Sequence, residues 1–199
     1  MGHIFVRAAL GAAMMLLGCL STLDGLDDGG APPPGPTMLG GEFAGGNGTA
    51  SDPYLITNVY ELQNMSKDLS AHYALANDID ASVTVSWNSG AGFAPVGTSS
   101  KPFTGSLDGQ NHTIKGLFIN RSTAAIIGLF GKISGSVKNV GLVSIDITGS
   151  NCVGGLVGYS YQGAVSNSHA TGNVTGSSSY VGGLMGCNII GTVSNSYAT

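Results

Sequence analysis

The hydrophobic positions of this chain fall in short runs of Val, Ile, Leu and Thr that glycine, serine and asparagine interrupt every few residues. From residue 126 to residue 199 these runs lack the spacing of three and four residues that marks an amphipathic helix. Such runs favour short strands joined by tight turns. The pattern therefore predicts an all-β fold.

One phrase is written three times, as IIGLFG at 126–131, VGGLVG at 153–158 and VGGLMG at 181–186. A second phrase follows each copy, as SVKNV, AVSNS and TVSNS. Repetition with a period of 27 to 28 residues indicates units that stack on one another to bury a shared apolar face. The repeated core positions are Leu129, Leu156, Leu184, Val137, Val165 and Val193.

Each unit is long enough to form one coil of a β-solenoid. Because a strand rises about 3.3 Å per residue, about 28 residues supply three short strands and three bends. Strand alternation then places the asparagine of the second phrase on the same side as its inward valine. We expect Asn139, Asn167 and Asn195 to form an inward ladder with rungs about 4.8 Å apart; surface turn asparagines are the alternative.

The recurring G-L-F/V/M-G phrase resembles the GLUG motif. This resemblance is strong over 126–199, divided as 126–152, 153–180 and an incomplete 181–199, and looser over 42–125. It implies a right-handed parallel β-helix on the cell exterior, as in large bacterial and archaeal surface proteins, adhesin-like chains and non-catalytic regions of metallopeptidases that cleave immunoglobulin A. The motif is structural and implies no catalytic residue.

The amino-terminal segment reads as an export signal over residues 1–19, with Arg7 before an apolar run that is too short to span a membrane. Leu16-Leu17-Gly18-Cys19 resembles a lipobox, so we expect lipidation of Cys19; ordinary cleavage and an uncleaved anchor are the alternatives. Residues 20–41 form a Gly/Pro-rich linker.

Residues 42–125 are expected to form the amino-terminal cap and the irregular first coils. A helix is predicted over 58–70, with Asn58 as its N-cap and Glu61 completing a capping box. Its apolar face, which includes Val59, Leu62 and Leu69, would cover the open first coil.

Several polar and aromatic groups are candidates for chemistry or binding. Asp78 and Asp80 would share one face of a strand, which suits either a calcium site or turn capping; capping is favoured because no DxDxDG loop is present. Asp108, Asn111 and His112 form the densest polar cluster, without a recognisable nucleophile. The aromatic residues Trp87, Phe93 and Phe103 could form a platform for stacking on sugars or could pack in a cap or loop. We favour packing.

The regular repeats are chemically sparse, since residues 147–199 contain no Asp, Glu, Lys or Arg. We therefore expect no catalysis, no cofactor and no metal. The alternatives are a β-helical carbohydrate-active enzyme, which would need paired carboxylates, and the non-catalytic amino-terminal region of a larger secreted metallopeptidase. A net charge of −4 with seven scattered basic residues argues against nucleic acid as a partner.

Two further expectations concern cysteines and the last coil. Cys152 and Cys187 are offset by seven residues between adjacent repeats, so we expect no disulfide between them. The last coil has no evident cap, which suggests either a fragment of a longer repeat protein or an end that stacks on another chain. The sequence as a whole predicts a lipid-anchored or secreted surface scaffold for adhesion or display, with glycans or surface proteins as partners.

Overall fold

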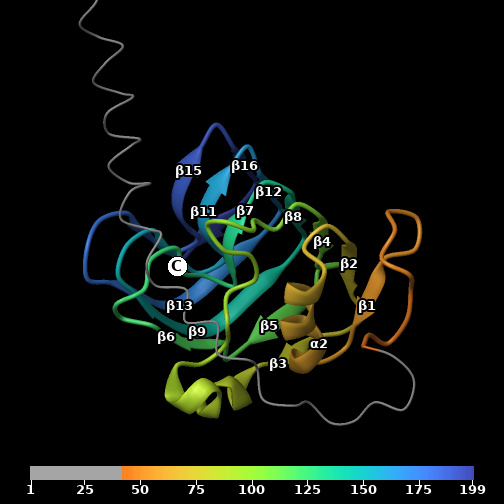
Figure 1. The fold of residues 1–199 in the computed structure, drawn as a ribbon, viewed down its shortest axis with the longest axis horizontal. Coiled ribbons are helices and arrows are strands. Elements are labelled where there is room, and N and C mark those ends of the chain that lie inside the picture. The colour runs from red at the N-terminus through yellow and green to blue at the C-terminus, as the bar shows by residue number, and fades with distance from the viewer. Residues whose placement is uncertain (1–41) are drawn as a thin grey trace, which may run out of the picture.

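The structure, a computed structural model, describes residues 42–199 as a parallel β-solenoid (Figure 1). The export signal, the linker and Cys19 lie outside the described residues. The strands are β1 (Tyr54–Ile56), β2 (His72–Leu75), β3 (Ile79–Asp80), β4 (Ser106–Asp108), β5 (Thr113–Lys115), β6 (Phe118–Asn120), β7 (Phe130–Ile133), β8 (Ser136–Lys138), β9 (Gly141–Gly149), β10 (Val153–Gly154), β11 (Val157–Tyr161), β12 (Ala164–Ser166), β13 (His169–Gly176), β14 (Val181–Gly182), β15 (Met185–Ile189), β16 (Thr192–Ser194) and β17 (Tyr197–Ala198).

The strands stack into parallel sheets that run the length of the solenoid. The first sheet has the order β1-β2-β4-β8-β12-β16, and the second has the order β17-β13-β9-β5-β3, with β6 also paired to β9. A third sheet, β15-β11-β7, and the small pair β10-β14 complete the regular coils. Each regular coil therefore passes from the third sheet to the first and then to the second.

The strand register confirms the predicted coil length. Ser136 pairs with Ala164 and Ala164 with Thr192, a step of 28 residues each time. The earlier coils are irregular, because His72 pairs with Ser106, 34 residues later. That longer coil contains the 3₁₀ turns Ser82–Ser86 and Asn88–Gly90, so the extra residues form local turns outside the stacked strands.

The repeated apolar residues fill the interior of the solenoid. Leu129 and Leu156 are fully buried, and Leu184 is nearly so. Val137 and Val165 are also buried, whereas Val193, at the same place in the last coil, is 44% exposed. The valine position is therefore exposed in the last described coil, whereas the leucine position stays largely buried there.

The predicted helix is present but shorter than 58–70. It comprises α2 (Val59–Asn64) and a 3₁₀ turn (Met65–Lys67). Asn58 caps it by accepting hydrogen bonds from the Tyr60 and Glu61 N–H groups, at 3.0 Å each. The chain leaves the helix at Asp68, whose carboxylate accepts from the Ser70 N–H at 3.0 Å, because such local bonds compete with helical ones.

The capping-box glutamate reaches one residue further back than the motif predicts. Glu61 is buried, and its Oε2 accepts from the N–H and hydroxyl of Thr57 at 2.6 and 2.9 Å. On the apolar face, Val59 and Leu62 join the core, and α2 lies beside the first strands (Figure 1). This arrangement fixes how the chain leaves β1 and enters α2.

The outer edge of β1 is covered by the chain that precedes it. The Leu55 N–H donates to the Gly45 carbonyl at 2.9 Å, and the Ala44 N–H donates to the Leu55 carbonyl at 3.1 Å. This antiparallel contact satisfies backbone groups that an edge strand otherwise exposes. Covering of the first coil is thus shared between α2 and this segment.

The expectation that Cys152 and Cys187 stay unpaired is wrong, because they form a disulfide with a Cα–Cα distance of 5.4 Å. The VGGLVG phrase bends sharply, so that Cys152 and Tyr159 lie in one cluster. Register then places Cys187 on Tyr159. In an extended chain, the seven-residue offset would keep the two cysteines apart, but the bend brings them together. The disulfide therefore joins two neighbouring coils.

We predict that the disulfide stabilises the fold by about 3 to 4 kcal/mol, since it closes a loop of 35 residues. Replacing both cysteines in Cys152→Ser/Cys187→Ser should lower the free energy of unfolding in urea by that amount. Peptide mapping of the unreduced wild type should yield a cross-linked peptide containing both residues. Full alkylation of both thiols without reductant would contradict the disulfide.

A matched pair of valines tests the stacked core. We predict that Val165→Ala costs about 2 kcal/mol of unfolding free energy, because it removes buried methyl groups. Val193→Ala makes the same chemical change at the exposed equivalent position and should cost less than half as much. Equal losses in urea unfolding would show that the two coils are equally packed.

Candidate functional surface

The most regular polar feature of the described chain lies at the bend between the first and second sheets. Asn139, Asn167 and Asn195 occupy this bend in successive coils, with left-handed φ values of 56°, 49° and 47°. Asparagine adopts this conformation more readily than most residues do. The left-handed turn ends strand alternation, so the expected inward orientation is wrong: Asn167 and Asn195 are exposed and Asn139 is half-buried.

The three asparagine side chains are hydrogen-bonded in a row. Asn195 Nδ2 donates to Asn167 Oδ1 at 3.2 Å, and Asn167 Nδ2 donates to Asn139 Oδ1 at 3.1 Å. The row ends where Asn139 Nδ2 donates to Asp108 Oδ1 at 3.0 Å. All the amides therefore point the same way, toward a carboxylate in the preceding coil.

Asp108 anchors this row, a role that the sequence analysis did not assign to it. Its carboxylate also accepts from the Gln110 N–H at 3.0 Å and lies 3.1 Å from Lys138 Nζ. Burial raises the pKa of Asp108, but the hydrogen bonds from Gln110, Asn139 and Lys138 outweigh burial and hold the pKa below its ordinary value of 3.8. The pairing of β4 with β8 puts Asp108 opposite Lys138, and this register is set by the fold.

Serines on the inner side of the same bend repeat the pattern. The Ser168 N–H donates to Ser196 Oγ at 3.1 Å, and each serine hydroxyl donates to the carbonyl two residues earlier, at 2.8 Å. Ser168 is buried. The S-N-S phrase thus satisfies backbone groups inside the bend while its asparagine stays outside.

Two aromatic rings stack directly after the asparagines. His169 and Tyr197 pair in register, with ring centroids 5.3 Å apart and planes 9° from parallel. The His169 ring lies over Gly141, where a Cβ would come within 2.5 Å of the His169 Cε1. The structure thus places an ordered ring pair beside the asparagine row.

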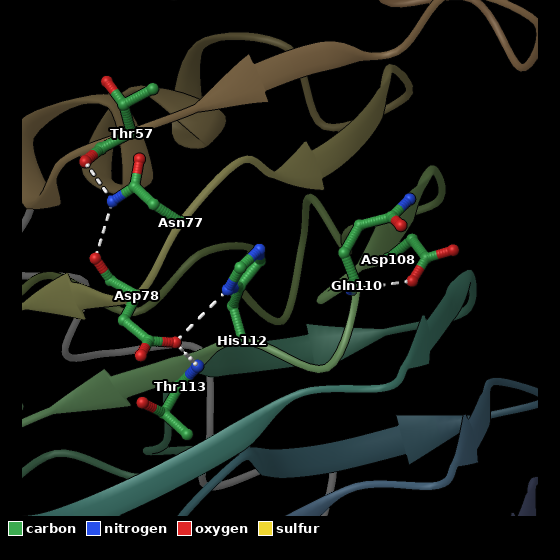
Figure 2. Close-up of polar contacts among 7 residues, drawn as sticks. All are labelled: Thr57, Asn77, Asp78, Asp108, Gln110, His112 and Thr113. Atoms are coloured by element: carbon green, nitrogen blue, oxygen red, sulfur yellow. Dashed lines mark hydrogen bonds and ion pairs between the residues drawn. The ribbon is translucent and has the colours of Figure 1, made fainter.

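Of the two aspartates considered for calcium, Asp80 caps a local turn, whereas Asp78 binds the backbone of the neighbouring coil. Asp78 Oδ1 accepts from the Thr113 N–H at 2.8 Å and lies 3.3 Å from His112 Nδ1 (Figure 2). The Thr113 hydrogen bond is the main reason that the pKa of Asp78 is lowered. Asp80 Oδ1 accepts from the Ser82 N–H at 2.9 Å. Over residues 42–199, no group of three or more His, Cys, Asp or Glu side chains is placed to hold a metal ion.

The polar cluster of Asp108, Asn111 and His112 separates in three dimensions. His112 faces Asp78, whereas Asp108 lies apart from both and accepts from Gln110 (Figure 2). Asp108 also contacts Lys138 and Asn139. Asn111 contributes a backbone N–H to the Asn139 carbonyl at 2.9 Å. The structure therefore does not bring Asp108 and His112 together as an acid–base pair.

Packing is the role of the three aromatic residues considered for sugar binding. Trp87, Phe93 and Phe103 are all buried in the main core cluster. The expected preference for packing over a sugar platform is confirmed. The exposed tyrosines of the described chain lie later, at Tyr161, Tyr180 and Tyr197.

We predict that Asp108→Asn lowers the free energy of unfolding by about 1 kcal/mol at pH 7, because it removes a carboxylate with three hydrogen-bond donors. The folded-state pKa is depressed, so the wild-type advantage is fully present above pH 3.8 and is lost as the pH falls through the folded-state value. Urea unfolding of both proteins between pH 7 and pH 2 measures the difference.

The exposed Asp146 on β9 provides a control, since Asp146→Asn should change stability little at pH 7. A difference between wild type and Asp108→Asn that stays constant down to pH 2 would contradict the assigned role of the carboxylate.

The sequence is similar to one family model and to two curated proteins. Residues 149–175 match the family model described as the GLUG motif. The chain is 43% identical over 143 residues to halomucin of Haloquadratum walsbyi, covering 67% of this chain and 2% of halomucin. It is 38% identical over 132 residues to a "Putative Gly-rich membrane protein" of Evansella cellulosilytica, covering 63% of this chain and 15% of that protein.

A solved structure also resembles the chain. The crystal structure of "a putative immunoglobulin A1 protease from Bacteroides ovatus" gives a TM-score of 0.46 at 18% identity, covering 80% of this chain and 78% of that one. The chain spans only a small part of the two curated relatives. In the described part of the chain, no helix is both long enough and apolar enough to cross a bilayer. The chain therefore carries a GLUG motif at residues 149–175, within coils that repeat every 28 residues.

Proposed function

We propose that this chain is a non-catalytic, exported surface scaffold that serves adhesion or display. The observation that carries the proposal is the chemistry of the regular coils. They are held by backbone pairing, an asparagine row and a buried apolar core, and residues 147–199 contain no Asp, Glu, Lys or Arg. Such coils suit a stiff spacer that presents a polar surface.

The acidic groups outside these coils support a structural role as well. Asp108 is engaged by Lys138 and Asn139, and Asp78 by Thr113. Glycoside hydrolysis typically uses two carboxyl groups placed on either side of the bond that is cleaved. The hydrogen bonds of these aspartates instead join neighbouring coils and anchor the asparagine row.

The disulfide between Cys152 and Cys187 supports export. Disulfides form and persist mainly outside the cytoplasm, where the surroundings are oxidising. A cross-link between adjacent coils would help an exported repeat to resist local opening. One relative is named as a "Putative Gly-rich membrane protein", which agrees with a location at the membrane. Lipidation of Cys19 would attach this chain to the membrane.

The anchor is tested by expressing the chain with its own leader and comparing wild type with Cys19→Ala. We predict that wild type is in the membrane fraction, begins at Cys19 and carries a diacylglyceryl group in intact-mass analysis. Cys19→Ala should be absent from that fraction, because a lipid chain supplies most of the membrane affinity. The control Cys187→Ser should keep the anchor.

Surface placement is tested separately by adding protease to intact cells. Digestion of wild type on intact cells is the expected result. A protein that is protected from protease, with Cys152 and Cys187 both reduced, would overturn export; a digested protein without a lipid would overturn the anchor alone.

A further inference from the structure

We infer that the bend formed by Asn167, His169, Asn195 and Tyr197 binds a neutral polysaccharide, with the outward edges of its stacked rings against the C–H groups of the sugars and its amides on sugar hydroxyls. This inference rests on the proposed surface function and names the ligand class for it. We call this set of four residues the amide–ring ridge.

The two halves of the ridge run side by side along the solenoid. In each coil the asparagine and the ring are two residues apart, so their Cα atoms are separated by about 7 Å at most. In-register pairing of β12 with β16 and of β13 with β17 repeats this arrangement one coil later, about 4.8 Å away. The ridge therefore presents two equivalent polar–aromatic pairs in a row.

The ridge amides retain hydrogen-bonding capacity toward solvent. A primary amide has two N–H donors and an oxygen with two lone pairs. Asn167 uses one donor toward Asn139 and one acceptor toward Asn195. An exposed donor and acceptor thus remain on Asn167, and they match the paired donor and acceptor of a hydroxyl group. The row also fixes the side-chain orientation, which lowers the entropy cost of binding.

The ring pair supplies the apolar part of the surface. Tyr197 is 58% exposed and stacks on His169, so the orientation of its ring is set before a ligand arrives. Carbohydrate rings carry apolar C–H faces and polar hydroxyl edges, and a ring beside amides complements both. Ligand sites commonly combine aromatic surface with a few placed polar groups in this way.

Charge favours a neutral ligand over an acidic one. The ridge contains no Lys, Arg, Asp or Glu, and none occurs from residue 147 to residue 199. The charged pair nearest to it along the asparagine row, Lys138 and Asp108, is joined at 3.1 Å. A carboxylate or sulfate of an acidic glycan would therefore lack a charged partner of the kind that binds such groups most strongly.

Affinity electrophoresis in native gels tests the inference. The probes are dextran, yeast mannan, xyloglucan and hydroxyethylcellulose as neutral polysaccharides, with alginate as the acidic control. We expect at least one neutral probe to retard the wild type. Tyr197→Ala and Asn167→Gly should each weaken that retardation about fivefold to tenfold; glycine is chosen because it keeps the left-handed turn.

Two variants separate binding from folding. Tyr197→Phe keeps the ring and should bind within about twofold of wild type. Tyr161→Ala removes another exposed tyrosine, on β11, and should leave retardation unchanged. Circular dichroism melting curves should coincide for all the variants used.

The inference is overturned if no neutral probe retards the wild type, if alginate alone does, or if Tyr197→Ala binds like wild type. In each of these cases, digestion on intact cells would still support the proposed surface function. Release of reducing ends from a probe would overturn its non-catalytic part instead.

Discussion

Parallel hydrogen bonding between successive coils, kept in register over a 28-residue step, is the interaction on which the rest of this structure depends. Register places each side chain on its equivalent in the next coil. Leucine then packs among leucines, an asparagine amide meets an amide, and the His169 ring meets the Tyr197 ring. Val137 and Val165, which pair with coils on both sides, are buried, whereas Val193 in the last described coil is 44% exposed.

The residues at the bends determine the polar surface of the solenoid, and the residues in the strands determine its core. A strand would send alternate residues inward, but the left-handed φ at each asparagine turns its side chain outward. The adjoining serine is then left to satisfy buried backbone groups. The S-N-S phrase thereby satisfies the backbone inside the bend and orders the asparagines on its outer surface. The proposed ligand would bind to that outer surface.

The departures from expectation share one physical origin, which is local geometry at bends. The helix ends early because Asp68 bonds to Ser70, and the asparagines face solvent because of their left-handed turns. Cys152 is bonded to Cys187 because the glycine-rich bend brings Tyr159 beside Cys152, and Cys187 pairs with Tyr159 in the next coil. A prediction from residue spacing assumes that the backbone keeps one conformation. Each of these turns changes the direction of the backbone, so the prediction fails there.

The sequence by itself determined the all-β class, the coil length, the stacked core residues and the helix cap at Asn58, because periodic apolar residues and capping side chains act through near neighbours or exact repeats. Only the tertiary structure decided the disulfide, the anchoring of the asparagine row on Asp108 and the separation of His112 from Asp108. These contacts join residues about one coil apart through bends of unequal length. Their distances therefore depend on the path of the backbone through three dimensions.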